Sequence, residues 1–203
     1  MQRKRTAILI SGRGSNMAAL IEAAKATDYP AEIVLVVANR PHAGGLATAE
    51  AAGIATTIVD HAAYEDRVAF DAALDEVLQA HGIDLICLAG FLRMLTPKFV
   101  EKWRGRMINV HPALLPQFKG LHTHARALAA GVKTHGATVH FVSAEVDSGP
   151  IIMQASVPVH DGDTEESLAA RVLTEEHRIY PAALRLLAEE QVSIDGAIAS
   201  ELK

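Results

Sequence analysis

Short apolar runs alternate with helix-like stretches along the first half of this chain, and this alternation constrains the fold most strongly. The runs of strand length are residues 6–10, 32–38, 55–59, 84–89 and 106–111. Helical spacing or alanine-rich stretches separate the first four of these runs, the longest over residues 64–81. Strands that alternate with helices build a mostly parallel, twisted sheet with helices on both faces.

The pattern changes beyond residue 112. A loop and a short helix over residues 125–130 precede two further strands, over 138–142 and 151–157, which a tight turn at 147–150 joins. A long helix then begins at Asp163-Thr164. We therefore expect one Rossmann-like α/β domain over residues 1–203, with an antiparallel C-terminal portion.

Composition limits the class of partner. Half of the 203 residues are hydrophobic and the formal net charge is -5, so a folded protein is expected, without general attraction to nucleic acid or membranes. The apolar run after Arg3-Lys4-Arg5 is too short for a signal segment, which favours a cytoplasmic protein. Cys87 is expected to be a buried small hydrophobe. These observations favour a small molecule as the partner.

A polar pair near the end of one apolar run marks a candidate site. In residues 106–112, Ile108 and Val110 alternate with Asn109 and His111, so a strand turns the amide and the imidazole toward one side. Burying two such groups costs free energy unless a partner or ligand satisfies them. We expect a site here, with Asp147 as its acid.

A glycine turn, residues 12–16, follows the first predicted strand. Backbone amides at a helix start, with the Ser15 and Asn16 side chains, suit one phosphate monoester. Alternatively, Ser15 or Asn16 only caps the helix. A dinucleotide site would need a third glycine, where this chain has Met17, and an acid where it has Asn39-Arg40. We therefore expect no NAD or NADP.

Together, Asn109, His111 and Asp147 suit acyl transfer. The amide is a neutral donor for a developing oxyanion, the imidazole adds a donor or a proton, and the carboxylate can fix its tautomer. No Ser or Cys lies at comparable spacing, so direct transfer is favoured over a covalent acyl-enzyme. Each residue also has a structural alternative: backbone bonding for Asn109, a cap for His111 and turn initiation for Asp147.

The other histidines carry weaker signals. His122 and His124 could ligate a metal, but no third ligand has a recognisable spacing, so no metal is expected. Those in turn-like or surface-like contexts, with no function expected, are His42, His61, His81 and His135.

Several segments, taken in order, resemble one enzyme family over nearly the whole chain. They are residues 8–16, 88–95, 109–116 and 147–150, together with 140–142 and 176–181. The family is phosphoribosylglycinamide formyltransferase, the folate-dependent glycinamide ribonucleotide transformylase of de novo purine synthesis. The resemblance implies transfer of the formyl group of 10-formyltetrahydrofolate, the co-substrate, to the amine of N1-(5-phosphoribosyl)glycinamide through a tetrahedral intermediate.

The resemblance also implies roles for individual residues. It makes Asn109, His111 and Asp147 catalytic. Those implied to hold the ribonucleotide are Gly14, Ser15, Asn16 and Glu176. Those implied at the folate are Arg67, Leu92, Arg93, Met94, Leu95, Asn109, Ala144, Glu145 and Val146. Approximately residues 1–100 form the phosphate-binding half and 101–203 the catalytic and folate-binding half, in a monomer or homodimer.

Two positions depart from the family pattern, and four rival functions stay open: two related formyl-group enzymes, a non-catalytic binding domain and a nucleotide oxidoreductase, which failure to bind NAD or NADP would remove. Leu173 stands where relatives often carry Gln or Lys near the ribonucleotide, and Ala113 replaces a frequent Ser. A 10-formyltetrahydrofolate hydrolase and methionyl-tRNA formyltransferase resemble the same core, but each carries an extra domain that this length does not hold. A non-catalytic phosphate- or folate-binding domain is the rival of another class.

Overall fold

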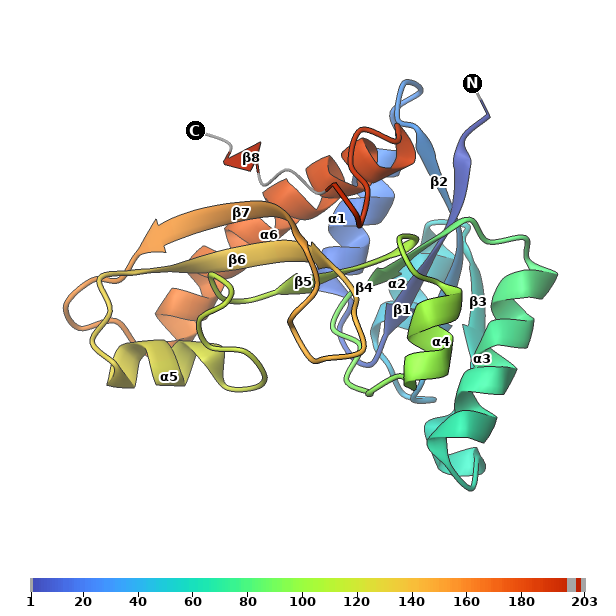
Figure 1. Cartoon of the computed structure of the whole chain (residues 1–203), viewed down its shortest axis with the longest axis horizontal. Coiled ribbons are helices and arrows are strands. Elements are labelled where there is room, and N and C mark those ends of the chain that lie inside the picture. Colours follow the sequence, from blue (N-terminus) through green and yellow to red (C-terminus); the bar gives the residue numbers. More distant parts are fainter. Residues whose placement is uncertain (1, 197–199, 202–203) are drawn as a thin grey trace.

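The strands of the computed structural model, which describes residues 2–196 and 200–201, form one sheet in the order β3-β2-β1-β4-β5-β6-β7-β8 (Figure 1). Neighbours from β3 to β5 run parallel, whereas β6 is antiparallel to β5 and β7. The strands are β1 Lys4–Ile10, β2 Ala31–Ala38, β3 Ala55–Ile58, β4 Leu85–Leu88, β5 Met107–His111, β6 Thr134–Phe141, β7 Ile151–Pro158 and β8 Ser200–Glu201.

Helices pack on both faces of this sheet, which confirms the predicted fold class. Buried side chains of α1, α2 and α6 form one apolar cluster, and those of α3 and α4 form a second cluster on the other face. The α-helices are α1 Ser15–Ala24, α2 Gly45–Ala51, α3 Arg67–Ala80, α4 Pro97–Lys102, α5 Thr123–Ala129 and α6 Glu165–Ala188, and a 3-10 turn, η1, spans His61–Ala63.

Strand β1 shows why its sequence is apolar without interruption. Ile8 and Ile10 belong to the first cluster, Ala7 and Leu9 to the second, and all four are fully buried. A central parallel strand that is covered on both faces needs apolar side chains on both. Cys87, on β4, is also fully buried as expected, and burial raises the pKa of its thiol to about 12.

Helix α6 ties the two halves of the sheet together. Thr164 caps its N-terminus by accepting from Ser167 N–H, in a capping box. Farther along, the fully buried Tyr180 hydroxyl lies 2.9 Å from the carbonyl oxygen of Leu88 in β4 and 3.2 Å from that of Ile108 in β5. This side chain therefore bridges two strands that carry the site.

Three elements were not predicted: the three-residue η1, α4 and β8. Helix α4 has only six residues, too few for a periodic pattern, although Thr96 caps it and Pro97 occupies its first turn. Strand β8 contains two residues. No helix within residues 2–196 and 200–201 combines the length and the apolar character needed to span a membrane.

Candidate active site

The predicted site residues gather where parallel strands end. The glycine turn follows β1, the 92–95 loop follows β4, and His111 is the last residue of β5. Parallel neighbours place these carboxyl ends at one edge of the sheet, where ligands bind in open α/β folds. Two segments far apart in sequence therefore lie at the same sheet edge as the polar end of β5, one after β1 and one after β4.

The β6–β7 connection folds back over the face of β5 that carries Asn109 and His111. Phe141, the last residue of β6, pairs with Ile108 near the start of β5, yet Asp147 Oδ2 lies 3.3 Å from His111 Nδ1. The two side chains are only 6% and 11% exposed. The structure thus brings all three predicted catalytic residues to one largely buried face.

Both ring nitrogens of His111 face acceptors. Nε2 lies 3.0 Å from the carbonyl oxygen of Phe118, which can only accept, so Nε2 carries a hydrogen. A neutral ring would then turn the Nδ1 lone pair toward the carboxylate of Asp147, whereas an imidazolium donates on both sides. The geometry therefore fits a protonated His111 paired with Asp147.

His140 is a site residue that sequence analysis missed. It pairs with Asn109 across β5 and β6, and its Nδ1 donates to the Phe141 carbonyl at 2.9 Å. Its Nε2 therefore keeps a lone pair, which faces Asn109 Nδ2 at 3.2 Å. Burial lowers the pKa of His140, which favours this neutral ring. The alternation of Thr138 and His140 with buried apolar residues was the available signal.

The glycine turn has the geometry of an anion site. Gly14, at φ 73°, is the N-cap of α1, and the described first turn of that helix contains no acidic residue. Its first amides have no acceptors within the helix and carry the positive end of the helix dipole. Because Gly14 is the N-cap and no side chain caps α1, the alternative in which Ser15 or Asn16 only caps this helix is wrong.

A second glycine allows this turn to pack tightly. The Gly45 N–H donates to the Gly12 carbonyl at 3.0 Å, and a Cβ on Gly45 would lie 2.7 Å from Ile10 Cδ1. Another residue at position 45 would force the Ile10 side chain to shift, and its Cβ would lie 3.3 Å from the carbonyl oxygens of Gly12 and Arg13 in the turn. The start of α2 therefore supports the glycine turn from behind.

Glu176 joins the glycine turn to α6. Asn16 Nδ2 donates to Glu176 Oε2 at 2.6 Å, and both residues are buried. Burial raises the pKa of the Glu176 carboxyl, and the bond from Asn16 partly opposes this rise. Within the described residues, Asn16 Oδ1 is buried without a hydrogen-bond partner. Polar side chains of α1 and α6 thus lie beside the glycine turn.

The 92–95 loop is fixed to the end of β1 by Ser11, another residue missed in the sequence. Leu92 N–H donates to Ser11 Oγ at 2.8 Å, and Ser11 Oγ donates to Asn39 Oδ1 at 2.6 Å. The Leu92 amide is therefore already used, which leaves its carbonyl for a ligand. Leu92 and Met94 are 62% and 57% exposed, so the loop presents apolar surface.

The other residues implied at the folate lie on two neighbouring segments. The Arg93 guanidinium lies 4.7 Å from the ring centroid of Phe70, which places this loop beside the first turns of α3, where Arg67 is exposed. Ala144, Glu145 and Val146 belong to the β6–β7 connection that carries Asp147. Leu95 is half-buried against the second apolar cluster. Leu173 lies half-buried on α6, three residues before Glu176.

The surface-like context predicted for His135 is wrong. This residue lies on β6, is 1% exposed, and packs edge-on against the rings of Phe118 and His124 at 5.7 and 5.3 Å. Burial lowers its pKa to about 4. Among the described residues, no group of three or more His, Cys, Asp or Glu side chains could hold a metal ion.

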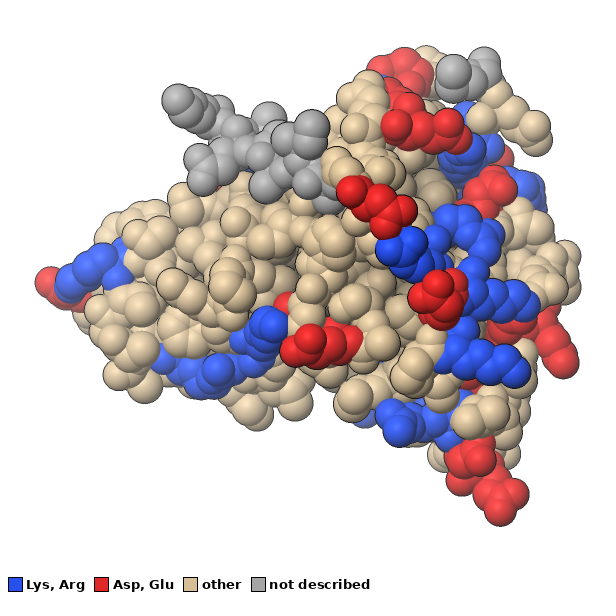
Figure 2. Space-filling view, viewed as in Figure 1, with Lys and Arg blue, Asp and Glu red and all other residues tan. Residues whose placement is uncertain are grey.

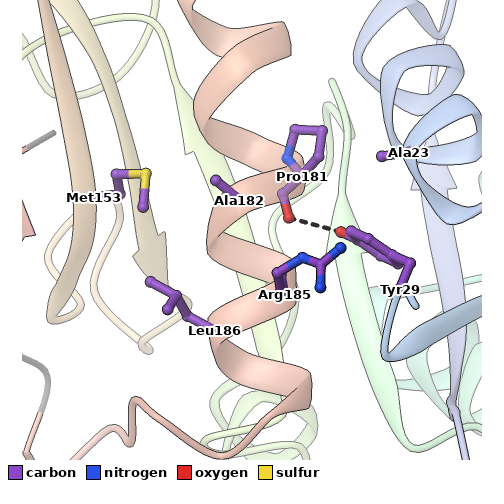
Figure 3. Close-up of a pocket in the computed structure, with 7 residues that line it drawn as sticks. All are labelled: Ala23, Tyr29, Met153, Pro181, Ala182, Arg185 and Leu186. Carbon is purple, nitrogen blue, oxygen red and sulfur yellow. Dashed lines mark hydrogen bonds between the residues drawn. The ribbon is translucent and has the colours of Figure 1, made fainter. Parts of the chain in front are cut away.

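A cavity of about 440 Å³ lies away from this site. It opens beside α6, on the face of the sheet opposite the polar side chains, and none of the predicted site residues lines it (Figure 3). Tyr29 donates to the Pro181 carbonyl at its wall.

Figure 2 shows acidic side chains interspersed among the basic ones on the viewed surface over α3 and α4.

Comparison with known proteins identifies the family. The family model described as "Formyl transferase" matches residues 4–184. The chain is 44% identical over 187 residues to phosphoribosylglycinamide formyltransferase of Escherichia coli (strain K12), which covers 92% of this chain and 88% of that protein. It is 49% identical over 193 residues to the trifunctional purine biosynthetic protein adenosine-3 of Homo sapiens, covering 95% of this chain. The chain spans about a fifth, 19%, of that longer relative.

Solved structures agree with the sequence comparisons. Glycinamide ribonucleotide transformylase 1 from Symbiobacterium toebii superposes with a TM-score of 0.93 at 48% identity, over 96% of this chain and 92% of that one. Phosphoribosylglycinamide formyltransferase from Brucella melitensis gives 0.89 at 53% identity, over 92% and 96%. The chain therefore belongs to the phosphoribosylglycinamide formyltransferase family of formyl transferases, which confirms the resemblance seen in its sequence.

Proposed function

We propose that this formyltransferase passes the formyl group of 10-formyltetrahydrofolate directly to the amine of glycinamide ribonucleotide, on the polar face of β5. The observation that carries the proposal is the buried His111–Asp147 pair beside Asn109, at the sheet edge where the glycine turn follows β1 and the 92–95 loop follows β4. A phosphate group at the first and a pterin at the second would bring the amine and the formyl carbon together over β5.

The reaction needs donors that stabilise negative charge on the formyl oxygen. The amine nitrogen attacks the formyl carbon, the C–N10 bond breaks, and the proton of the amine passes to N10 by way of a water near Asp147. His140 accepts from one N–H of Asn109 Nδ2, and within the described part of the chain the second N–H has no acceptor, so it would donate to the oxyanion. His111 adds its donor by sharing or releasing the Phe118 carbonyl, while Asp147 keeps the ring protonated.

Binding of the two substrates divides between the segments already described. The amides after Gly14, with Ser15 and Asn16, would hold the phosphate, and Glu176 would accept from the ribose hydroxyls. Arg67 would meet the glutamate tail of the folate, near the exposed apolar side chains of the 92–95 loop. The carbonyls of that loop and residues 144–146 would contact the pterin.

One assay separates the proposed transfer from its rivals. The loss of 10-formyltetrahydrofolate is followed with and without glycinamide ribonucleotide. We expect loss only with the amine, with one formylated ribonucleotide formed for each folate deformylated. Loss without the amine would show a hydrolase, and binding of both molecules without any loss would show a non-catalytic domain.

Other expectations from the sequence stay predictions. They are a cytoplasmic location, a monomer or homodimer, the division into halves near residue 100, and a reaction without metal or NAD(P). The folate as co-substrate is supported by the family and by the geometry of the 92–95 loop.

A further inference from the structure

The segment formed by residues 118–122 contacts both members of the His111–Asp147 pair through its backbone. The Phe118 carbonyl lies 3.0 Å from His111 Nε2, and the Gly120 N–H donates to Asp147 Oδ2 at 2.8 Å. Any shift of this segment therefore changes the geometry of the pair on both sides at once.

This segment has a strained backbone. Phe118 and His122 have φ values of 54° and 56°, in the left-handed region that costs L-residues with a side chain on the order of 1 kcal/mol or more each. Such conformations persist only where the surroundings hold them. Helix α5 supplies one stabilising contact, because Arg126 Nη1 donates to the Lys119 carbonyl at 2.6 Å.

A second stabilising contact joins the segment to the turn that carries Asp147. Lys119 Nζ donates to Ser148 Oγ at 2.6 Å, and Ser148 Oγ donates to the Val146 carbonyl at 2.9 Å. That turn is itself fixed against β6, since a Cβ on Gly149 would lie only 1.8 Å from the Phe141 carbonyl oxygen. The Lys119–Ser148 bond thus fastens the strained segment to a rigid support.

The ion pair of Lys119 with Glu145 does not supply the same hold. Its nitrogen and oxygen are 3.9 Å apart, and the Glu145 side chain is 81% exposed. Exposed pairs of this kind contribute little to stability. The directional bond to Ser148 is the one that sets position.

We propose that Lys119 and Ser148 form a clasp that positions the catalytic pair, an inference that rests on the roles proposed above for His111 and Asp147. Neither clasp residue is placed in contact with the reacting atoms. Without the clasp, the 118–122 segment keeps His111 and Asp147 in their paired geometry for a smaller fraction of the time. Turnover then falls, while binding at the glycine turn and the 92–95 loop is unchanged.

The test compares Lys119→Met, Ser148→Ala and the double variant by steady-state kinetics, with Lys133→Met as the matched control. Lys133 loses an exposed ion pair with Asp161 instead. We expect each clasp variant to lose about tenfold in kcat, the scale of one hydrogen bond to a charged group, with KM for the ribonucleotide within about threefold. The double variant should lose no more than either single one, and the control should keep its kcat.

Two results would overturn the clasp. One is a kcat within twofold of wild type in both single variants, and the other is losses that multiply in the double variant, which would mean independent roles. Asp147→Asn is measured beside them, because full turnover in that variant would refute the proposed catalytic pair itself. Ser148→Ala removes a single oxygen, so its kcat decides the matter even where Lys119→Met folds poorly.

Discussion

Replacing Asp147 by Asn removes a charge that lies 3.3 Å from His111 Nδ1 and 3.7 Å from His140 Nε2. Asn keeps the size of the side chain and an acceptor for Gly120 N–H, and it tolerates the left-handed φ of 48° found at this position. At 3.3 Å, the attraction between carboxylate and imidazolium is about 5 kcal/mol for an effective dielectric constant of about 20. Because both side chains are nearly buried, solvent screens this pair only slightly.

The loss of this attraction should appear in turnover. If the protonated ring stabilises the oxyanion, about 5 kcal/mol corresponds to a fall in kcat of at least about 10³-fold, since each 1.36 kcal/mol is tenfold. Steady-state kinetics with both substrates saturating checks this fall.

A matched control tests whether the chemical change alone lowers kcat. Asp161→Asn makes the same chemical change at a side chain that is 98% exposed, and it should leave kcat unchanged. The reasoning is refuted if Asp147→Asn keeps kcat within tenfold of wild type while its thermal midpoint is also unchanged.

Three further outcomes follow from buried polar groups. Tyr180→Phe should lower the free energy of unfolding by about 1–1.5 kcal/mol in urea titrations, because two strand carbonyls lose a donor. Glu176→Gln should raise KM for the ribonucleotide alone. Because burial raises the pKa of the Glu176 carboxyl, the wild-type protein should lose stability as pH rises from 4.5, and the variant should lack that loss in thermal melts across pH. Burial lowers the pKa of His135 to about 4, so stability should fall as pH drops from 6.5 toward 4, and less so in His135→Phe.

The sequence was informative wherever a local pattern decides the structure. Period-2 alternation placed Asn109 and His111 on one face of a strand, and the glycine turn after β1 was predicted in its place. Apolar runs located the parallel strands to within a few residues, because covered strands must be apolar on both faces. Helix α4 was not predicted because its six residues form fewer than two helical turns.

Long-range geometry could not be predicted from local patterns. Nothing in residues 142–150 indicates that this connection folds back over β5 to bring Asp147 beside His111. The partners of His140 and Ser11 likewise depend on strand pairing and on a loop distant in sequence. His135 was misjudged because its neighbours Thr134 and Gly136 suggest a turn, whereas pairing with β7 buries the ring.

The measurement that tests the central claim most directly is the kcat of Asn109→Ala with both substrates saturating. The amide is held by His140 with a second N–H free for the formyl oxygen, so its loss should lower kcat on the order of a hundredfold or more. Gln79→Ala, which loses a bond to Asp75 on α3, should keep full turnover. Nearly full turnover in Asn109→Ala would contradict formyl transfer on this face of β5.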